Sequence, residues 1–141
     1  MKKILLLVIA IMTFTPMTNA QIKKTGESNT KTIASARMGI VVLRQSDKDF
    51  YLSMTTTNQF DNAMLLKLGD TKESAKQSLN DLLDILESLE GDASQYIDSG
   101  FGRELRLWKL MGALYISADG YAGNGNISKS ELKKFIKALQ E

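Results

Sequence analysis

The sequence of 141 residues predicts one α+β domain of two layers, in which a roughly five-stranded, mainly antiparallel sheet carries two helices on one face. Three observations predict this fold. Short segments alternate apolar and polar residues as half-buried strands do, two longer segments repeat apolar residues at helical spacing, and the links between neighbouring strands are short. The expected order of elements is β-β-β-α-β-β-α, within residues 38–141.

Residues 1–20 have the layout of a secretory signal peptide. Lys2 and Lys3 precede an apolar run over 4–12, Pro16 follows, and Ala20 is a small residue at a possible cleavage point before Gln21. The run is shorter than the roughly 20 residues of a membrane-spanning helix, so we expect no stable membrane insertion. This layout is typical of bacteria and predicts a protein exported to the periplasm or secreted.

The charge balance argues against a nucleic-acid partner. The chain has 18 Lys and Arg against 16 Asp and Glu, and removal of residues 1–20 takes away two lysines, which leaves 16 of each. Nucleic-acid binding normally needs a basic excess that neutralises phosphates. The predicted domain therefore has no net charge, and we expect no nucleic-acid partner.

Residues 21–37 are mostly polar and predict a flexible leader. The first expected strands form a hairpin over 39–55, because residues 40–43 are mainly β-branched and residues 50–55 alternate strictly. The turn between them is Ser-Asp-Lys-Asp. A third apolar strand is expected over 63–68.

The clearest helical pattern spans 71–90 and ends at Gly91. Asp70 or Thr71 is a suitable N-cap, and Glu73 stands at capping-box spacing from Asp70. The apolar stripe of this helix packs most simply on the sheet and consists of Ala75, Leu79, Leu82, Leu86 and Leu89.

Residues 91–102 contain three glycines and predict a loop, which two alternating strands over 104–110 and 114–118 follow. A glycine-rich loop over 120–126 leads to the last helix, for which Ser128 and Glu131 form a capping box. Each half of the domain thus ends in a strand, a turn and a capped helix, which is a faint sign of an internal repeat.

One face of the predicted sheet carries aromatic, hydroxyl and guanidinium side chains. If Leu105, Leu114 and their apolar neighbours pack under the helices, the opposite face receives Tyr51, Ser53, Arg106, Trp108 and Tyr115. Trp, Tyr and Arg are enriched at recognition surfaces, although an ordinary solvated face also tolerates them. We therefore expect this face to bind a protein or a saccharide.

The loop over 119–131 is the alternative site, for calcium or an anion. It is similar to an EF-hand loop, with Gly125 at the turn position and Glu131 at the last ligand position. The candidate metal ligands are Asp119, Asn124, Asn126 and Glu131. The first and third ligand positions hold Gly120 and Ala122, which lack side-chain oxygens, so the pattern is incomplete.

Catalysis has little support in this sequence. The chain contains no His and no Cys, which excludes Ser-His-Asp triads, Cys-His pairs and ordinary zinc sites. No cofactor motif is complete. We therefore expect a small exported binding protein that is not an enzyme and needs no cofactor.

Overall fold

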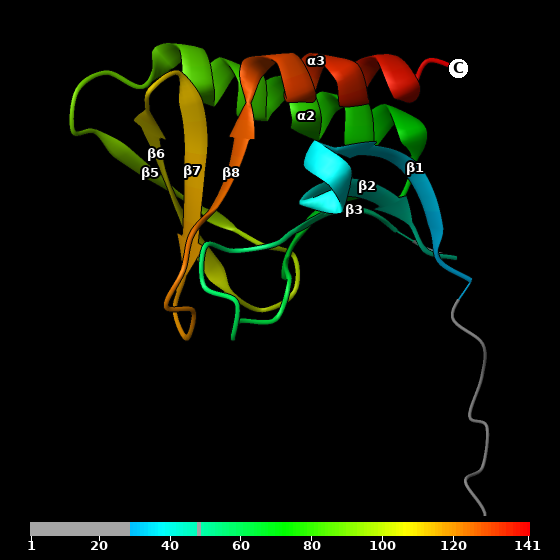
Figure 1. Cartoon of the computed structure of the whole chain (residues 1–141). Coiled ribbons are helices and arrows are strands. Elements are labelled where there is room, and N and C mark those ends of the chain that lie inside the picture. Colours follow the sequence, from blue (N-terminus) through cyan, green and yellow to red (C-terminus); the bar gives the residue numbers. More distant parts are fainter. Residues whose placement is uncertain (1–28, 48) are drawn as a thin grey trace, which may run out of the picture.

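The computed structural model describes residues 29–47 and 49–141 (Figure 1). The α+β class is confirmed, but the expected single sheet of five strands is wrong. The described residues form two antiparallel four-stranded sheets, and one helix follows each sheet. The predicted signal peptide over 1–20, and residues 21–28 of the predicted leader, lie outside the described residues.

The first sheet and its helix occupy the first half of the described chain. The strand order is β1-β2-β3-β4, and a short 3-10 turn, η1, joins β1 to β2. The elements are β1 (Lys31–Ala36), η1 (Arg37–Gly39), β2 (Val41–Gln45), β3 (Phe50–Met54), β4 (Met64–Gly69) and α2 (Lys72–Ser88).

The second half repeats this order of four strands and a helix. Its strands are again neighbours in chain order, β5-β6-β7-β8. The elements are β5 (Ser94–Asp98), β6 (Glu104–Leu110), β7 (Ala113–Ala118), β8 (Gly125–Ser128) and α3 (Lys129–Ala138).

Three strands were missing from the sequence prediction, and each is an edge strand. β1 lies within the segment predicted as a flexible leader, β5 within the predicted loop 91–102, and β8 within the predicted glycine-rich loop and helix cap. β1 and β5 are mostly exposed, and β8 has only four residues, so these segments contain few apolar residues. Ile127 of β8, for instance, is that strand's only large apolar side chain, and it is fully buried.

Both helices begin where the sequence predicts, at reciprocal caps. The Thr71 hydroxyl accepts a hydrogen bond from the Ser74 N–H, and the Ser74 hydroxyl accepts one from the Thr71 N–H. Ser74 therefore completes the box that the sequence assigned to Glu73. The second expected box is confirmed, because Ser128 and Glu131 cap α3 in the same reciprocal way.

One apolar core lies between the helices and both sheets. Figure 1 shows α2 and α3 lying side by side across one face of both sheets. The predicted stripes of both helices face this core, and Ala75, Leu79, Leu132 and Phe135 are fully buried in it. The strand faces beneath are equally buried, which confirms the predicted phases of β3, β6 and β7. None of the helices in the described part is long and apolar enough to cross a membrane.

Two loops join the sheets at the side away from the helices. The N–H of Thr57, in the β3–β4 loop, donates to the carbonyl of Asn124, just before β8. Asp61 accepts hydrogen bonds from the Thr56 hydroxyl and from the Gly123 N–H, the latter at 2.8 Å. A Cβ atom at Gly123 would lie 2.4 Å from the Asn58 nitrogen, so only glycine permits this approach.

The Asp61 junction makes stability depend on pH. Desolvation acts to raise the pKa of Asp61, but hydrogen bonds from Gly123, Thr56 and Ala122 outweigh it and hold the pKa below the ordinary value of 3.8. A lowered folded-state pKa means that the stability supplied by ionised Asp61 is complete above this ordinary value. It is lost as the pH falls through the folded-state pKa.

Replacing Asp61 with Asn therefore lowers the free energy of unfolding by a constant amount near neutral pH, and this difference shrinks in acid. Urea unfolding at a series of pH values on both sides of the ordinary pKa measures it. Asp92→Asn is the matched control, because the exposed Asp92 side chain makes no hydrogen bond in the described part of the chain. An Asp61→Asn difference that stayed constant throughout the acid range would contradict this role.

Candidate functional site

The register of the second sheet places three predicted site residues in adjoining rows on its outer face. Trp108 pairs with Tyr115 on one side and with Ser94 on the other, and Tyr115 pairs with Asn126. In the next row, Arg106 lies between Tyr96 and Ser117. The intervening residues of β6 and β7 point into the core. This outer face is therefore turned away from the helices.

The aromatic side chains of this face form a small platform with a cation at its edge. The rings of Trp108 and Tyr115 lie with centroids 5.7 Å apart and planes tilted by 31°. The Arg106 guanidinium carbon is 5.7 Å from the centre of the Trp108 ring, within the range of a cation–π contact. Tyr96 stands beside Arg106 on the edge strand with 57% of its surface exposed.

Two shallow hollows meet at Arg106. The first has a volume of about 410 Å³ and runs from Tyr96 and Arg106 past Glu104 and Ser117 to Tyr121. The second has a volume of about 490 Å³ and extends from Arg106 and Trp108 to Lys109 and the Gly91–Asp92 turn. Arg106 is therefore placed to contact a ligand in either hollow.

Most polar side chains of this face make no hydrogen bond or ion pair with another described residue. Within the described residues, the side chains of Tyr96, Glu104, Tyr115 and Ser117 make no hydrogen bond or ion pair, and Arg106 makes only its contact with Trp108. Polar groups on a ligand can therefore bond to these side chains without breaking a bond that the fold uses. The face offers hydroxyls, a carboxylate and a guanidinium around aromatic rings.

The other two predicted site residues lie elsewhere, so the expected five-residue site is divided. Tyr51 and Ser53 belong to β3 of the first sheet, where they pair with Lys67 and Leu65 of β4. The Tyr51 ring packs edge-on against Phe101, with centroids 6.1 Å apart. The strand phases were predicted correctly, but a single sheet was assumed.

Sequence reasoning missed Tyr96 as a member of this face and Tyr121 as a residue that lines the first hollow. Tyr96 lay in a segment read as a loop because of its flanking glycines, although Tyr96 and Ile97 are good strand residues. Tyr121 follows β7 and stacks under Arg103, whose guanidinium carbon is 5.0 Å from its ring centre. In both segments, the tyrosine was the feature of the sequence that could have indicated a place in the site.

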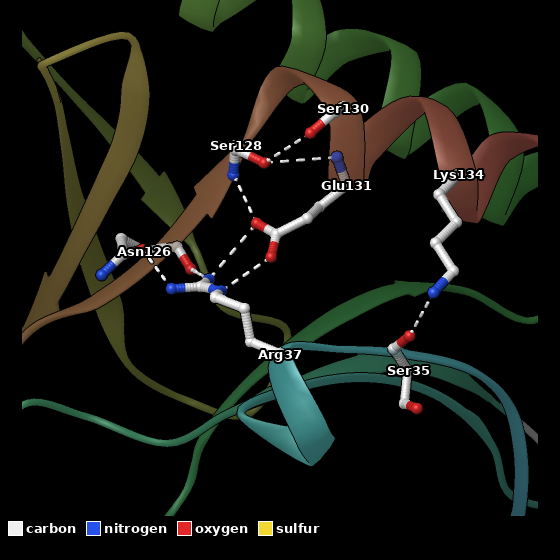
Figure 2. Close-up of polar contacts among 7 residues, drawn as sticks. All are labelled: Ser35, Arg37, Asn126, Ser128, Ser130, Glu131 and Lys134. Atoms are coloured by element: carbon white, nitrogen blue, oxygen red, sulfur yellow. Dashed lines mark hydrogen bonds and ion pairs between the residues drawn. The ribbon is translucent and has the colours of Figure 1, made fainter.

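Two of the four candidate metal ligands of 119–131, Asn126 and Glu131, have side-chain partners within the protein. Figure 2 shows Arg37, from the turn after β1, reaching Asn126 and Glu131. Its Nη1 lies 2.6 Å from the Asn126 Oδ1, and its Nε lies 2.7 Å from the Glu131 Oε1. The Glu131 side chain is only 12% exposed, and its Oε2 accepts the Ser128 N–H at 2.7 Å.

This arrangement differs from an EF-hand in its backbone as well as in its ligands. Residues 125–128 form strand β8 where a calcium loop is needed, and the Asn124 backbone N–H donates to the Thr57 hydroxyl. The Asp119 carbonyl accepts a hydrogen bond from Arg103. In the described part of the chain, no three His, Cys, Asp or Glu residues gather where they could hold a metal ion. Arg37, Asn126 and Glu131 instead tie the first sheet to α3.

Comparison of the chain with protein-family models, curated proteins and solved structures finds no match.

The structural role of Glu131 is tested by Glu131→Ala. The change removes both the capping-box partner and the ion pair with Arg37, so we expect the free energy of unfolding to fall by about 1–2 kcal/mol in urea. Arg37→Ala keeps the cap but removes the ion pair and both hydrogen bonds to Asn126, and it should also lower the free energy of unfolding. Millimolar calcium is expected to leave all three melting temperatures unchanged. Calcium that stabilised the unsubstituted protein but not Glu131→Ala would instead indicate a metal site.

Proposed function

We propose that this chain is a small exported binding protein without catalytic activity, and that it recognises its partner with the outer face of the second sheet. The site consists of Tyr96, Arg106, Trp108, Tyr115 and Ser117. The observation that carries this proposal is the Trp108–Tyr115 platform, which borders Arg106 and polar side chains that have no partner in the described part of the chain.

The division of labour between the two sheet faces supports recognition. The inner face holds the fold through buried residues such as Leu107 and Ile116, whereas Trp108 and Tyr115 stay partly exposed on the other side. Trp, Tyr and Arg are enriched among the residues that dominate binding energy at protein interfaces, and Trp and Tyr bury large areas at a low cost in rotamer entropy. Trp108, Tyr115 and Arg106 lie together outside the core, so they are well suited to recognition.

The shape of the site favours a partner larger than an enclosed small molecule. Both hollows are open, and they extend along the sheet from Tyr121 to Leu110. A saccharide would stack its apolar ring face on Trp108 and Tyr115 and bond its hydroxyls to Ser117, Glu104 and Arg106. A protein loop would use the same rings as an anchor. The site is therefore compatible with a saccharide and with a protein loop.

The absence of catalysis in this proposal rests on how the available nucleophiles are used. With no His or Cys in the chain, the remaining catalytic designs are a Ser-Lys pair near the start of α3 and paired carboxylates. The carboxylates over 81–90 lie on the exposed side of α2 or just after its end, which suits solubility better than acid–base chemistry. The Ser128 hydroxyl caps α3. The Lys129 ammonium lies 2.5 Å from a Glu87 carboxylate oxygen. Both groups already have structural roles.

The binding face is tested by fluorescence, because Trp108 is the only tryptophan in the chain. A panel of soluble oligosaccharides is titrated against the mature protein, and protein partners are sought by affinity capture. Tyr115→Ala and Arg106→Ala keep the reporter and should each weaken binding at least about tenfold. Their free energies of unfolding should change by no more than about 1 kcal/mol, the span of strand propensities.

Tyr51→Ala is the matched control, since it removes a tyrosine from the outer face of the first sheet. It should leave binding unchanged. The proposal fails if Tyr51→Ala abolishes binding while Tyr115→Ala and Arg106→Ala retain it.

The proposed export is tested separately by expressing the full chain in a bacterium and sequencing the N-terminus of the protein outside the cytoplasm. The expected first residue is Gln21, and replacement of Leu5 and Leu6 with Lys should trap the full chain in the cytoplasm. A full-length chain that stays in the cytoplasm without this replacement would refute export.

A further inference from the structure

The two sheets part between β4 and β5, and a groove lies beside this gap. The facing edges of β4 and β5 meet at one hydrogen bond, from the Lys67 N–H to the Ser99 carbonyl at 2.8 Å. Gly100 makes this approach possible, because a Cβ atom there would lie 2.5 Å from the Lys67 Cβ. Among the described strands, β4 pairs only with β3 and β5 only with β6, so each sheet ends here in an open edge.

Beyond that hydrogen bond, an apolar groove opens between α2 and β5. It has a volume of about 190 Å³, and its apolar wall includes Leu68, Leu82, Ile85 and Ile97. The register places Gln95 and Ile97 on the helix side of β5, yet Gln95 is exposed and Ile97 only half-buried. The helices therefore cover β6 and β7 but leave this end of the core accessible.

The rim of the groove is acidic. Asp81 of α2 accepts a hydrogen bond from Gln77, and Asp98 accepts one from the Gly100 N–H. Neither carboxylate forms an ion pair in the described part of the chain. Lys67 also lines the groove, but its ammonium pairs with Asp49 at 2.7 Å, and this hydrogen bond raises the pKa of Lys67. The groove thus offers two uncompensated negative charges beside an apolar hollow.

We propose that this groove binds an extended, basic segment of a partner protein. The segment adds a strand along the open edge of β5, inserts one apolar side chain between Leu82 and Ile97, and places a neighbouring Lys or Arg at Asp81 and Asp98. Strand addition at an open sheet edge is a common mode of peptide recognition, in which backbone bonds give affinity and side-chain pockets give specificity. The acidic rim selects a cationic partner.

The test uses fluorescence polarisation with a labelled peptide that alternates leucine and lysine and has protected ends. Saturable binding to the mature protein is expected, and two changes should each weaken it at least about tenfold. The first is Asp81→Lys on the exposed side of α2. The second is N-methylation of alternate peptide bonds, which blocks strand pairing but keeps the charge.

Glu73→Lys is the matched control, because it makes the same charge change in the first turn of α2 outside the groove. It should leave binding unchanged, and a peptide with glutamate in place of lysine should bind Asp81→Lys better than the unsubstituted protein. Tyr115→Ala should have no effect, which separates this site from the face of the second sheet. Equal weakening by Glu73→Lys, full affinity of the N-methylated peptide, or dimerisation through β5 in place of peptide binding would each overturn the proposal.

Discussion

Burial of one apolar core beneath two adjacent helices is the constraint on which the rest of this structure depends. Two four-stranded sheets are joined by few direct backbone bonds, so α2 and α3 must hold them together by packing on both. The chain has no cysteine, and no disulfide can share this task. Each fully buried Leu, Ile or Phe contributes about 1.5–3 kcal/mol through the hydrophobic effect, and this core contains many of them. The inner face of each sheet is thus committed to stability.

The polar residues at the junctions complete this arrangement. Arg37 fixes the turn after β1 to Asn126 and Glu131, and Asp61 fixes the β3–β4 loop to Gly123. Both junctions consume side chains that would otherwise be candidate ligands. The outer face of the second sheet is different, since the side chains of Arg106 and its neighbours form no hydrogen bond or ion pair within the described residues. Recognition can therefore be built there without weakening the fold.

The sequence allowed prediction of those elements in which local pattern and burial agree. The stripe from Ala75 to Leu89 and the Ser128–Glu131 cap fixed both helices, and strict alternation gave the correct phases of β3, β6 and β7. The strands β1 and β5 could not be predicted because they are mostly exposed, and β8 because Ile127 is its only large apolar residue. Without these three strands the division into two sheets could not be predicted. The division into two sheets determines which of the predicted site residues share a face. Trp108 and Tyr115 were grouped correctly, whereas Tyr51 was assigned to the same face only because one sheet was assumed.

We propose that the outer face of the second sheet binds a partner, while the core and the polar junctions maintain the fold. Backbone amide chemical-shift mapping tests it most directly, with the isotope-labelled mature protein titrated by the partner that affinity capture or the oligosaccharide panel yields. The account predicts the largest changes at Tyr96, Arg106, Trp108, Tyr115 and Ser117, with residues of α2 and α3 almost unmoved. Changes centred on residues 119–131 or on the outer face of the first sheet, with the amides of β6 and β7 unaffected, would contradict it.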